Sequence, residues 1–187
     1  MLAVAEAVVV TIVKATSVDA MSFSRPVVVM GVSGTGKSTI GAALADALGL
    51  PFVEGDDLHP EANVAKMAAG IPLTDDDRAP WLDLIAAELD HPVVVTCSAL
   101  KRRYRDRLRD AAPDLALVYL HGTAELLAAR MEGRDGHFMP TALLESQLAT
   151  LEVPEPDEDA IPADVELRPD EIVELVVGRL RKETPRG

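Results

Sequence analysis

The stretch GVSGTGKS at residues 31–38 constrains the fold of this chain more than any other feature. Its spacing, G-x-x-x-x-G-K-[ST], is that of the Walker A loop, which cradles the phosphates of a nucleotide. Glycine lets such a loop turn tightly, and the loop N–H groups and the N-terminus of the following helix then attract the anion. The loop residues expected at the nucleotide are Gly31, Ser33, Gly34, Thr35, Gly36, Lys37, Ser38 and Thr39.

The neighbouring sequence supplies the strand and the helix that this loop requires. The run Val27-Val28-Val29 leads into it and is typical of a buried strand, and helical spacing of apolar residues continues from Ile40 to a stop at Gly49. Lys37 would reach the β- and γ-phosphates, and the Ser38 hydroxyl would bind Mg²⁺. This context argues against the alternative, a Gly- and Ser-rich turn with an exposed lysine.

Composition narrows the class of protein. The chain has 187 residues, which suits one domain, and its net charge of −13 argues against a nucleic-acid partner. Its one cysteine, Cys97, excludes an internal disulfide and fits a reducing cytoplasm. Because Cys97 ends an apolar run, we expect a buried and inert thiol.

The first twenty residues stand apart from the rest. The stretch LAVAEAVVVTIVKA is apolar, but it is too short to span a bilayer and Glu6 interrupts it, so we expect no membrane partner. Met21 opens a stretch where a compact domain would naturally begin. We therefore expect residues 1–20 to be an extension without an assigned role and residues 21–187 to form one domain. The alternative is an extra edge strand or helix.

Strand and helix patterns alternate along the chain. After the first strand, strands are expected at 51–54, 92–97, 115–120 and 163–167, and helices at 61–69, 79–89, 101–111, 123–131, 140–150 and 169–182. Such alternation predicts an α/β fold with a mostly parallel sheet, helices on both faces, and ligands at the carboxyl ends of the strands. The acid- and proline-rich segment 152–162 is expected to be a solvated connection; a place beside the adenine is the alternative.

The positions of the acidic residues indicate which class of phosphate-transferring protein this chain belongs to. The strand at 92–97 ends without the Walker B acid of motors, helicases and AAA-type ATPases, and the Asn-Lys-x-Asp motif of GTPases is absent. Acids instead follow the second strand. If that strand continues, Glu54 and Asp56 point the same way, where a carboxylate can take a proton from an acceptor hydroxyl or hold Mg²⁺ through water. Asp57 is expected to cap the next helix.

Cationic residues gather at three places in this acidic chain. Arg78 is expected just before the helix at 79–89. The run at 101–109 holds six cations, most of them expected on a solvated face with pairs such as Arg102–Asp106, while Lys101 lies nearest the strand end and the site. The stretch RMEGRDGHFMP, with cations Arg130, Arg134 and His137, is hinged by glycines and predicts a mobile lid at about 130–140. A plain surface loop is the alternative.

Four stretches together resemble the gluconate kinase (gluconokinase) family of small P-loop kinases, which is related to shikimate and adenylate kinases. They are MGVSGTGKST, GDDLHPEANVAKMAAGIPLTDDDRAPWL, CSALKRRYRDRLR and GRDGHF, of which the second is the most specific. The resemblance runs from about residue 26 to the end of the chain and is poor at 152–167. It implies a P-loop fold with a five-stranded parallel sheet, helices on both faces and a mobile lid. It also implies ATP- and Mg²⁺-dependent phosphorylation of D-gluconate at its 6-hydroxyl, feeding the pentose phosphate route, and commonly a homodimer.

The residue types suit a small polyol that carries one carboxylate. Four residues can supply positive charge to this substrate: Arg78, Lys101, Arg134 and His137. His59 and Asp56 can form hydrogen bonds with its hydroxyl groups. In this hypothesis Asp56 deprotonates the 6-hydroxyl, Lys37 and Arg134 neutralise the transferring phosphate, Arg130 holds the nucleotide, and Glu54 holds Mg²⁺ through water. The alternatives are a kinase of the same fold for shikimate or a nucleoside monophosphate, and a nucleotide-binding regulator without catalysis.

Overall fold

The computed structural model describes residues 23–132 and 141–183. Residues 1–22, 133–140 and 184–187 lie outside this description. The expected N-terminal extension therefore falls outside the described residues, as do Arg134, His137 and most of the expected lid.

In the described part of the chain, five parallel strands form one sheet in the order β2-β3-β1-β4-β5. Their bounds are β1 Val27–Met30, β2 Phe52–Val53, β3 Val94–Thr96, β4 Ala116–His121 and β5 Ile161–Asp164. The central β1 pairs Val28 with Val95 on one side and with Leu117 on the other. Its four residues are all buried, as expected for a strand that is covered on both faces.

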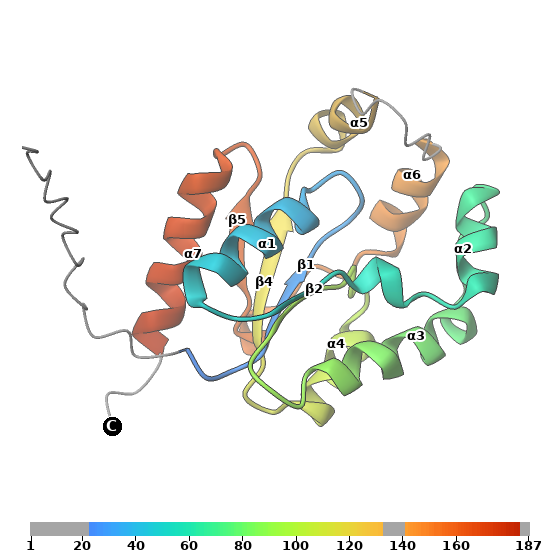
Figure 1. Ribbon diagram of the computed structural model, residues 1–187. Helices are drawn as coiled ribbons and strands as arrows, with labels where there is room; N and C mark the ends of the chain where they lie inside the picture. The colour runs from blue at the N-terminus through green and yellow to red at the C-terminus, as the bar shows by residue number, and fades with distance from the viewer. Residues whose placement is uncertain (1–22, 133–140, 184–187) are drawn as a thin grey trace, which may run out of the picture.

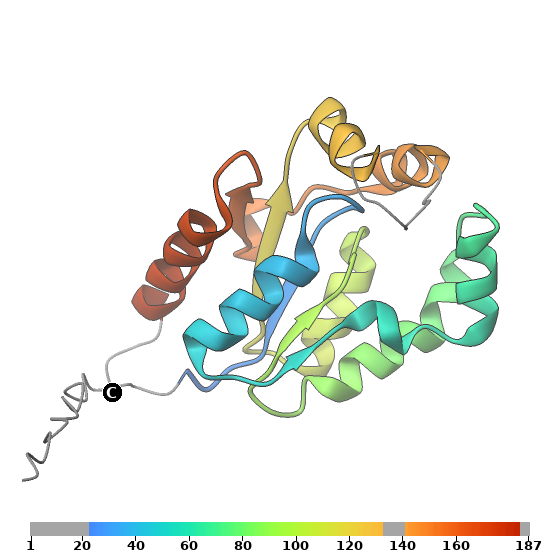
Figure 2. The ribbon, with the colours of Figure 1, turned by 45° about the horizontal axis from the view of Figure 1, so that its top comes forward.

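Seven α-helices accompany the strands in the described part of the chain (Figure 1). They are α1 Lys37–Leu48, α2 Glu61–Ala68, α3 Asp75–Glu88, α4 Arg102–Ala111, α5 Ala124–Glu132, α6 Thr141–Thr150 and α7 Pro169–Glu183. Helices α1 and α7 cover one face of the sheet and α3 and α4 the other, while α5 and α6 lie beyond the strand ends (Figure 2). This architecture confirms the predicted α/β fold with a five-stranded parallel sheet.

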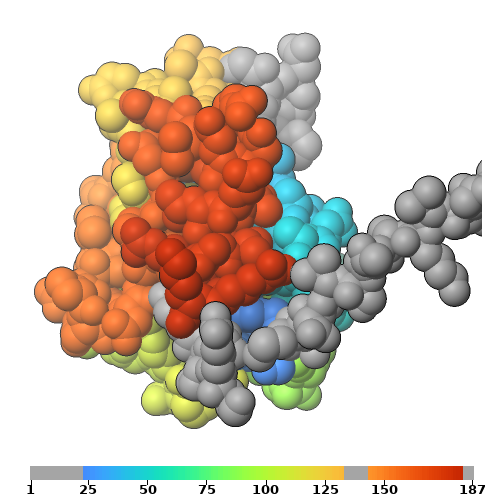
Figure 3. Space-filling view, turned by 90° about the vertical axis from the view of Figure 1, so that its left-hand side faces the viewer, coloured from blue at the N-terminus to red at the C-terminus, as the bar shows by residue number. Residues whose placement is uncertain are grey.

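Alternation along β1 divides the core into two layers. Val27 and Val29 pack in one cluster with Leu44 of α1 and Val176 of α7. Val28 and Met30 pack in the other, among buried side chains of α3 and α4. Both faces of the sheet are therefore buried. At the β5 edge, α7 and the segment before it form the molecular surface (Figure 3).

Several predicted elements have different bounds in the structure. Strand β2 ends at Val53 and a 3-10 helix, Gly55–Leu58, follows it, so Glu54 and Asp56 do not continue the strand. Asp57 lies in that turn and does not cap α2, which Pro60 precedes. The last strand occupies 161–164 rather than 163–167.

Helix α3 begins four residues earlier than expected, so Arg78 lies inside it rather than before it. Thr74 caps the helix: its hydroxyl accepts the Asp77 N–H at 3.2 Å, and its own N–H donates to the Asp77 carboxylate at 2.9 Å. This reciprocal pair satisfies two donors at the helix start. The helix that begins at Asp75 also includes Pro80.

A buried ion pair corrects two further expectations. Arg105 was expected on a solvated face and Glu158 in a solvated loop, yet both side chains are 1% exposed. The Arg105 Nε–H donates to Glu158 Oε2 at 2.5 Å, and its Nη1 donates to the carbonyls of Ala99 at 3.1 Å and Glu152 at 2.9 Å. Such burial is tolerated because the charges are paired and their donors are satisfied.

Two other expectations about single groups have clear outcomes. Arg102 does form the expected i,i+4 pair with Asp106, at 3.9 Å. Cys97 is fully buried, and burial raises the pKa of its thiol to about 12, which confirms an inert cysteine. Among the described residues, no helix has the length and apolar character needed to cross a membrane.

Candidate active site

The loop at residues 31–38 connects β1 to α1, as its motif predicts. Gly34 and Gly36 both have φ of 84°, in the region that favours glycine. A Cβ on Gly31 would lie 2.7 Å from the Leu120 carbonyl oxygen, and one on Gly34 would lie 3.0 Å from that of Leu127. The glycines are therefore needed both for the turn and because β4 and α5 approach the loop closely.

The loop ends at the N-terminus of α1, where helix N–H groups have no partner within the helix. Lys37 is the first residue of α1, and its Nζ donates across the loop to the Val32 carbonyl at 3.2 Å. Ser38 and Thr39 follow with exposed side chains. Backbone donors, a helix dipole and a lysine at one point form an anion site suited to phosphates.

A cavity beside the loop collects five of the residues expected at the site: Ser33, Lys37, Asp56, His59 and Arg78. It is lined by Ser33, Lys37, Asp56, His59, Met67, Pro72, Leu73, Arg78, Trp81, Ser98, Leu143, Ser146 and Gln147. Lys37, Asp56, His59 and Arg78 come from α1, the 3-10 turn, the residue after that turn, and α3. We call this the acceptor cavity. Its polar groups lie at the carboxyl ends of the strands, where ligands of such sheets bind.

The surroundings of His59 favour its neutral ring. It stacks on Trp81 with the ring centroids 4.2 Å apart, and its Nδ1 lies 3.4 Å from Asn63 Nδ2. Burial lowers the pKa of His59, and Arg78 lowers it further, although Asp56 acts in the opposite direction. A neutral imidazole can both donate to and accept from hydroxyl groups.

Arg78 is oriented by backbone contacts. Its Nη1 donates to the Leu73 carbonyl at 2.5 Å, and its guanidinium lies 6.0 Å from the centre of the Tyr104 ring. Within residues 23–132 and 141–183, no carboxylate forms an ion pair with Arg78. A fixed guanidinium at a cavity, without a protein carboxylate on it, suits a ligand carboxylate or phosphate.

Lys101 has a different environment from the one expected. Its Nζ lies 2.9 Å from one Asp75 oxygen and 3.1 Å from the other, and it does not line the acceptor cavity. Arg103 and the Tyr104 hydroxyl also bind Asp75, and together these contacts hold the pKa of that carboxyl well below its usual range. Lys101 thus ties the start of α4 to the start of α3, and its contact with substrate stays a prediction.

Glu54 also lies outside the lining of the acceptor cavity. The Thr96 hydroxyl donates to the Glu54 carboxylate, and the Thr96 hydroxyl oxygen accepts the Gly55 N–H at 2.9 Å. In the described part of the chain, no three His, Cys, Asp or Glu side chains are grouped to hold a metal by themselves. The donors present, the Ser38 hydroxyl with carboxylates at the strand ends, fit Mg²⁺, which takes few protein ligands and completes its shell with phosphate and water.

A second cleft, of about 260 Å³, lies on the other side of the loop. It is lined by Gly34, Thr35, Gly36, Thr39, Ile40, Arg130, Val165, Leu167, Pro169 and Ile172. Arg130 Nη2 donates to the Val165 carbonyl at 2.6 Å, which fixes this predicted nucleotide residue against the segment after β5. We call this the nucleotide cleft. Its apolar residues at 165–172 were not singled out in the sequence, although they immediately follow the last strand.

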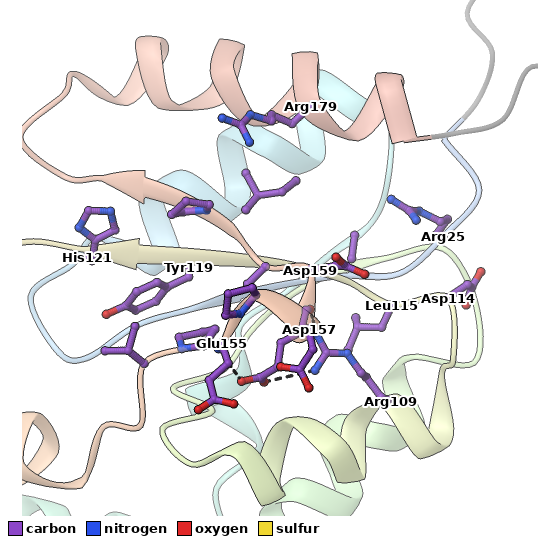
Figure 4. A pocket seen from close by; sticks show the side chains of 18 of the residues that line it. Arg25, Arg109, Asp114, Leu115, Tyr119, His121, Glu155, Asp157, Asp159 and Arg179 are labelled. Carbon is purple, nitrogen blue, oxygen red and sulfur yellow. Dashed lines mark hydrogen bonds and ion pairs between the residues drawn. The ribbon is translucent and has the colours of Figure 1, made fainter.

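The segment 152–162 lies away from both cavities. It borders a wider groove of about 1280 Å³, which contains no residue of the loop at 31–38 (Figure 4). Arg109, on one wall of this groove, lies 3.4 Å from the Glu158 carboxylate. The alternative that this segment borders the adenine therefore has no support in the geometry, and the nucleotide cleft uses residues 165–172 instead.

Sequence reasoning also missed several lining residues of the acceptor cavity. Trp81 lies in the DDDRAPWL motif and could have been found there, since its ring forms the stacking surface for His59. Ser98, Ser146 and Gln147 gave no signal. The last two lie on α6, whose place over the site depends on tertiary packing.

The strand order, the loop after β1 and the two cavities on either side of it define a P-loop kinase. In agreement, residues 27–154 match the family described as "AAA domain". The chain belongs to the gluconokinase family of these kinases. It is 50% identical over 165 residues to a gluconokinase of Gluconobacter oxydans, which covers 85% of this chain and 93% of that protein. A crystal structure of a gluconokinase from Sinorhizobium meliloti is 54% identical, with a TM-score of 0.81, over 86% of this chain and 93% of that one.

More distant structures share the fold alone. A shikimate kinase from Aquifex aeolicus has a TM-score of 0.53 and 16% identity over 87% of this chain and 99% of that one. The match to the family described as "AAA domain" agrees with the P-loop of this chain. The missing Walker B acid argued against a motor, a helicase or an AAA-type ATPase; β3 does end at Thr96 without an acid, and the relatives named above are kinases.

Proposed function

We propose that this protein transfers the γ-phosphate of ATP to the 6-hydroxyl of D-gluconate, giving 6-phospho-D-gluconate. The observation that carries the proposal is the acceptor cavity, which joins Arg78, His59 and Asp56 to Lys37 of the phosphate loop. A cation without a protein carboxylate and groups that read hydroxyls suit a small polyol acid.

Each end of the substrate has a partner in this proposal. Arg78 binds the gluconate carboxylate, and the neutral ring of His59 bonds to a hydroxyl of the chain. Asp56 accepts the proton of the 6-hydroxyl while that oxygen forms a bond to the γ-phosphorus and the bond from phosphorus to the ADP oxygen breaks.

The remaining groups stabilise charge and bind the nucleotide. Lys37 and the α1 N-terminus neutralise the phosphate oxygens, and Arg130 with residues 165–172 holds the nucleoside. Ser38, together with Glu54 through water, would hold Mg²⁺, which supplies further neutralisation of the phosphates. Arg134 and His137 are proposed to act from the lid, and Lys101 to act near the substrate. We also propose a homodimer that works in the cytoplasm.

A coupled assay of ADP release tests the proposal. Purified protein is given ATP and Mg²⁺ with gluconate, shikimate or a nucleoside monophosphate. Only the sample with gluconate is expected to release ADP with a turnover rate of about 1 s⁻¹ or faster. Turnover with another acceptor and not with gluconate would contradict it. Tight nucleotide binding without turnover on any acceptor would instead identify a regulator. Light scattering of the purified protein tests the dimer.

A further inference from the structure

The Gln147 side chain links helix α6 to the phosphate loop. The Ser33 N–H donates to Gln147 Oε1 at 2.7 Å, across 114 residues of sequence. Helix α6 packs into the core through Leu144 and Leu148. Leu143 and Gln147, one helical turn apart, line the acceptor cavity instead. Gln147 thus touches the loop and the cavity at once.

The chemistry of this contact fixes the orientation of the amide. A backbone N–H can donate only to an acceptor, so the carbonyl oxygen of Gln147 faces Ser33 and the NH₂ group lies on the other side of the amide. Over residues 23–132 and 141–183, the Gln147 NH₂ makes no hydrogen bond to protein. It supplies two donors to a site whose ligand carries several hydroxyls.

Ser33 lies on the acceptor side of the phosphate loop. Ser33 and Lys37 line the acceptor cavity, whereas Gly34, Thr35 and Gly36 line the nucleotide cleft. Gln147 therefore accepts the Ser33 N–H on the side of the loop that faces the acceptor cavity. The sequence had predicted Ser33 as a nucleotide-binding residue instead. A change at residue 147 acts first on the acceptor.

We propose that Gln147 is a positioning and specificity residue for the acceptor. Its Oε1 holds the Ser33 N–H and so fixes the loop, while its NH₂ donates to one hydroxyl of the polyol chain. The inference rests on the proposed function, because it takes gluconate as the acceptor. It adds a contact between α6, the loop and the substrate that keeps the receiving hydroxyl in line with the γ-phosphate.

Two substitutions separate the halves of the amide. Gln147→Glu keeps an oxygen for the Ser33 N–H, removes the donors and adds a negative charge beside an anionic substrate. Gln147→Met keeps the length and removes both halves. We expect the KM for gluconate to rise about tenfold in Gln147→Met and further in Gln147→Glu, with the KM for ATP within about twofold of wild type. Glu145→Gln, at an exposed position of the same helix, is the control and should match wild type.

Deoxygluconates identify the contact itself. Wild-type protein should lose about tenfold in kcat/KM on the one analogue that lacks the contacted hydroxyl, and Gln147→Met should show no such loss on it. The inference is overturned if both variants keep the wild-type KM for gluconate. It is equally overturned if the KM for ATP rises as much as that for gluconate, or if no analogue loses its penalty in Gln147→Met. Absence of turnover by the wild-type protein overturns the proposed function together with the inference, which distinguishes the two failures.

Discussion

Replacing Glu158 by glutamine tests the energetic role of the buried ion pair. The substitution keeps the shape of the side chain and removes its charge, which leaves the Arg105 guanidinium buried at 1% exposure without a counter-charge. Breaking a buried pair from one side typically costs about 3–5 kcal/mol. For a domain whose free energy of unfolding is about 5–15 kcal/mol, Glu158→Gln should be folded but clearly weakened.

The lowered pKa of Glu158 predicts how the contribution of the same pair changes with pH. Its hydrogen bonds from Arg105 lower the pKa from 4.5 to about 2, which corresponds to about 3 kcal/mol. Because the folded-state pKa is the lower one, this stabilisation is complete above pH 4.5 and is lost as the pH falls toward 2. About 1 kcal/mol of it should already be lost at pH 3.5.

Urea unfolding between pH 7 and pH 3.5 measures both effects. We expect Glu158→Gln to lower the free energy of unfolding at pH 7 by about 3 kcal/mol, or the melting temperature by about 6–12 °C. The gap between wild type and variant should then narrow by about 1 kcal/mol at pH 3.5. Glu155→Gln is the matched control, since its carboxylate is 70% exposed and pairs with Arg102. It should cost less than about 1 kcal/mol.

Two results would refute this reasoning. If Glu158→Gln is as stable as Glu155→Gln at pH 7, the buried pair contributes nothing beyond an exposed one. If the gap between wild type and variant stays constant down to pH 3.5, the carboxylate does not titrate as its contacts require.

Three further variants test the site. Asp56→Asn should lower kcat by about 10²–10⁴ with little change in the ATP dissociation constant, because asparagine cannot accept the proton; a near-normal kcat would remove Asp56 from the mechanism. Arg78→Ala should raise the KM for gluconate about ten- to a hundredfold and leave that for ATP nearly unchanged, whereas the opposite pattern would place Arg78 at the donor. Gly55→Ala should lower the melting temperature and the activity together, because the new Cβ would lie 1.8 Å from the Thr96 carbonyl oxygen; a stable and active variant would show that the turn shifts freely.

Local patterns in the sequence predicted the fold well. The valine run at β1 indicates a buried strand, and the glycine spacing after it indicates a phosphate loop. Both features depend only on residues that are close together in the sequence. The start of α3 was missed although its cap, Thr74, and Asp77 are also close neighbours in the sequence. The two-residue β2 fell below the length at which alternation can indicate where a strand ends.

Contacts between distant segments could not be predicted in this way. Arg105 and Glu158 each look like ordinary surface charges, and only the fold, which brings positions 53 residues apart together, turns them into a buried pair. The same holds for Gln147, whose partner is 114 residues away. Lys101 was expected at the site because it lies near a strand end, but it forms an ion pair with Asp75 of α3 instead. Charge alone therefore indicated candidate residues without indicating which of them face the cavity.

The acceptor cavity and the nucleotide cleft have no lining residue in common. Ser33 and Lys37 of the loop line the first, and Gly34, Thr35 and Gly36 line the second, so one eight-residue loop borders two separate pockets. In such a protein, a change in acceptor preference can arise through the segments around Asp56, Arg78 and α6 while the handling of the nucleotide stays as it is.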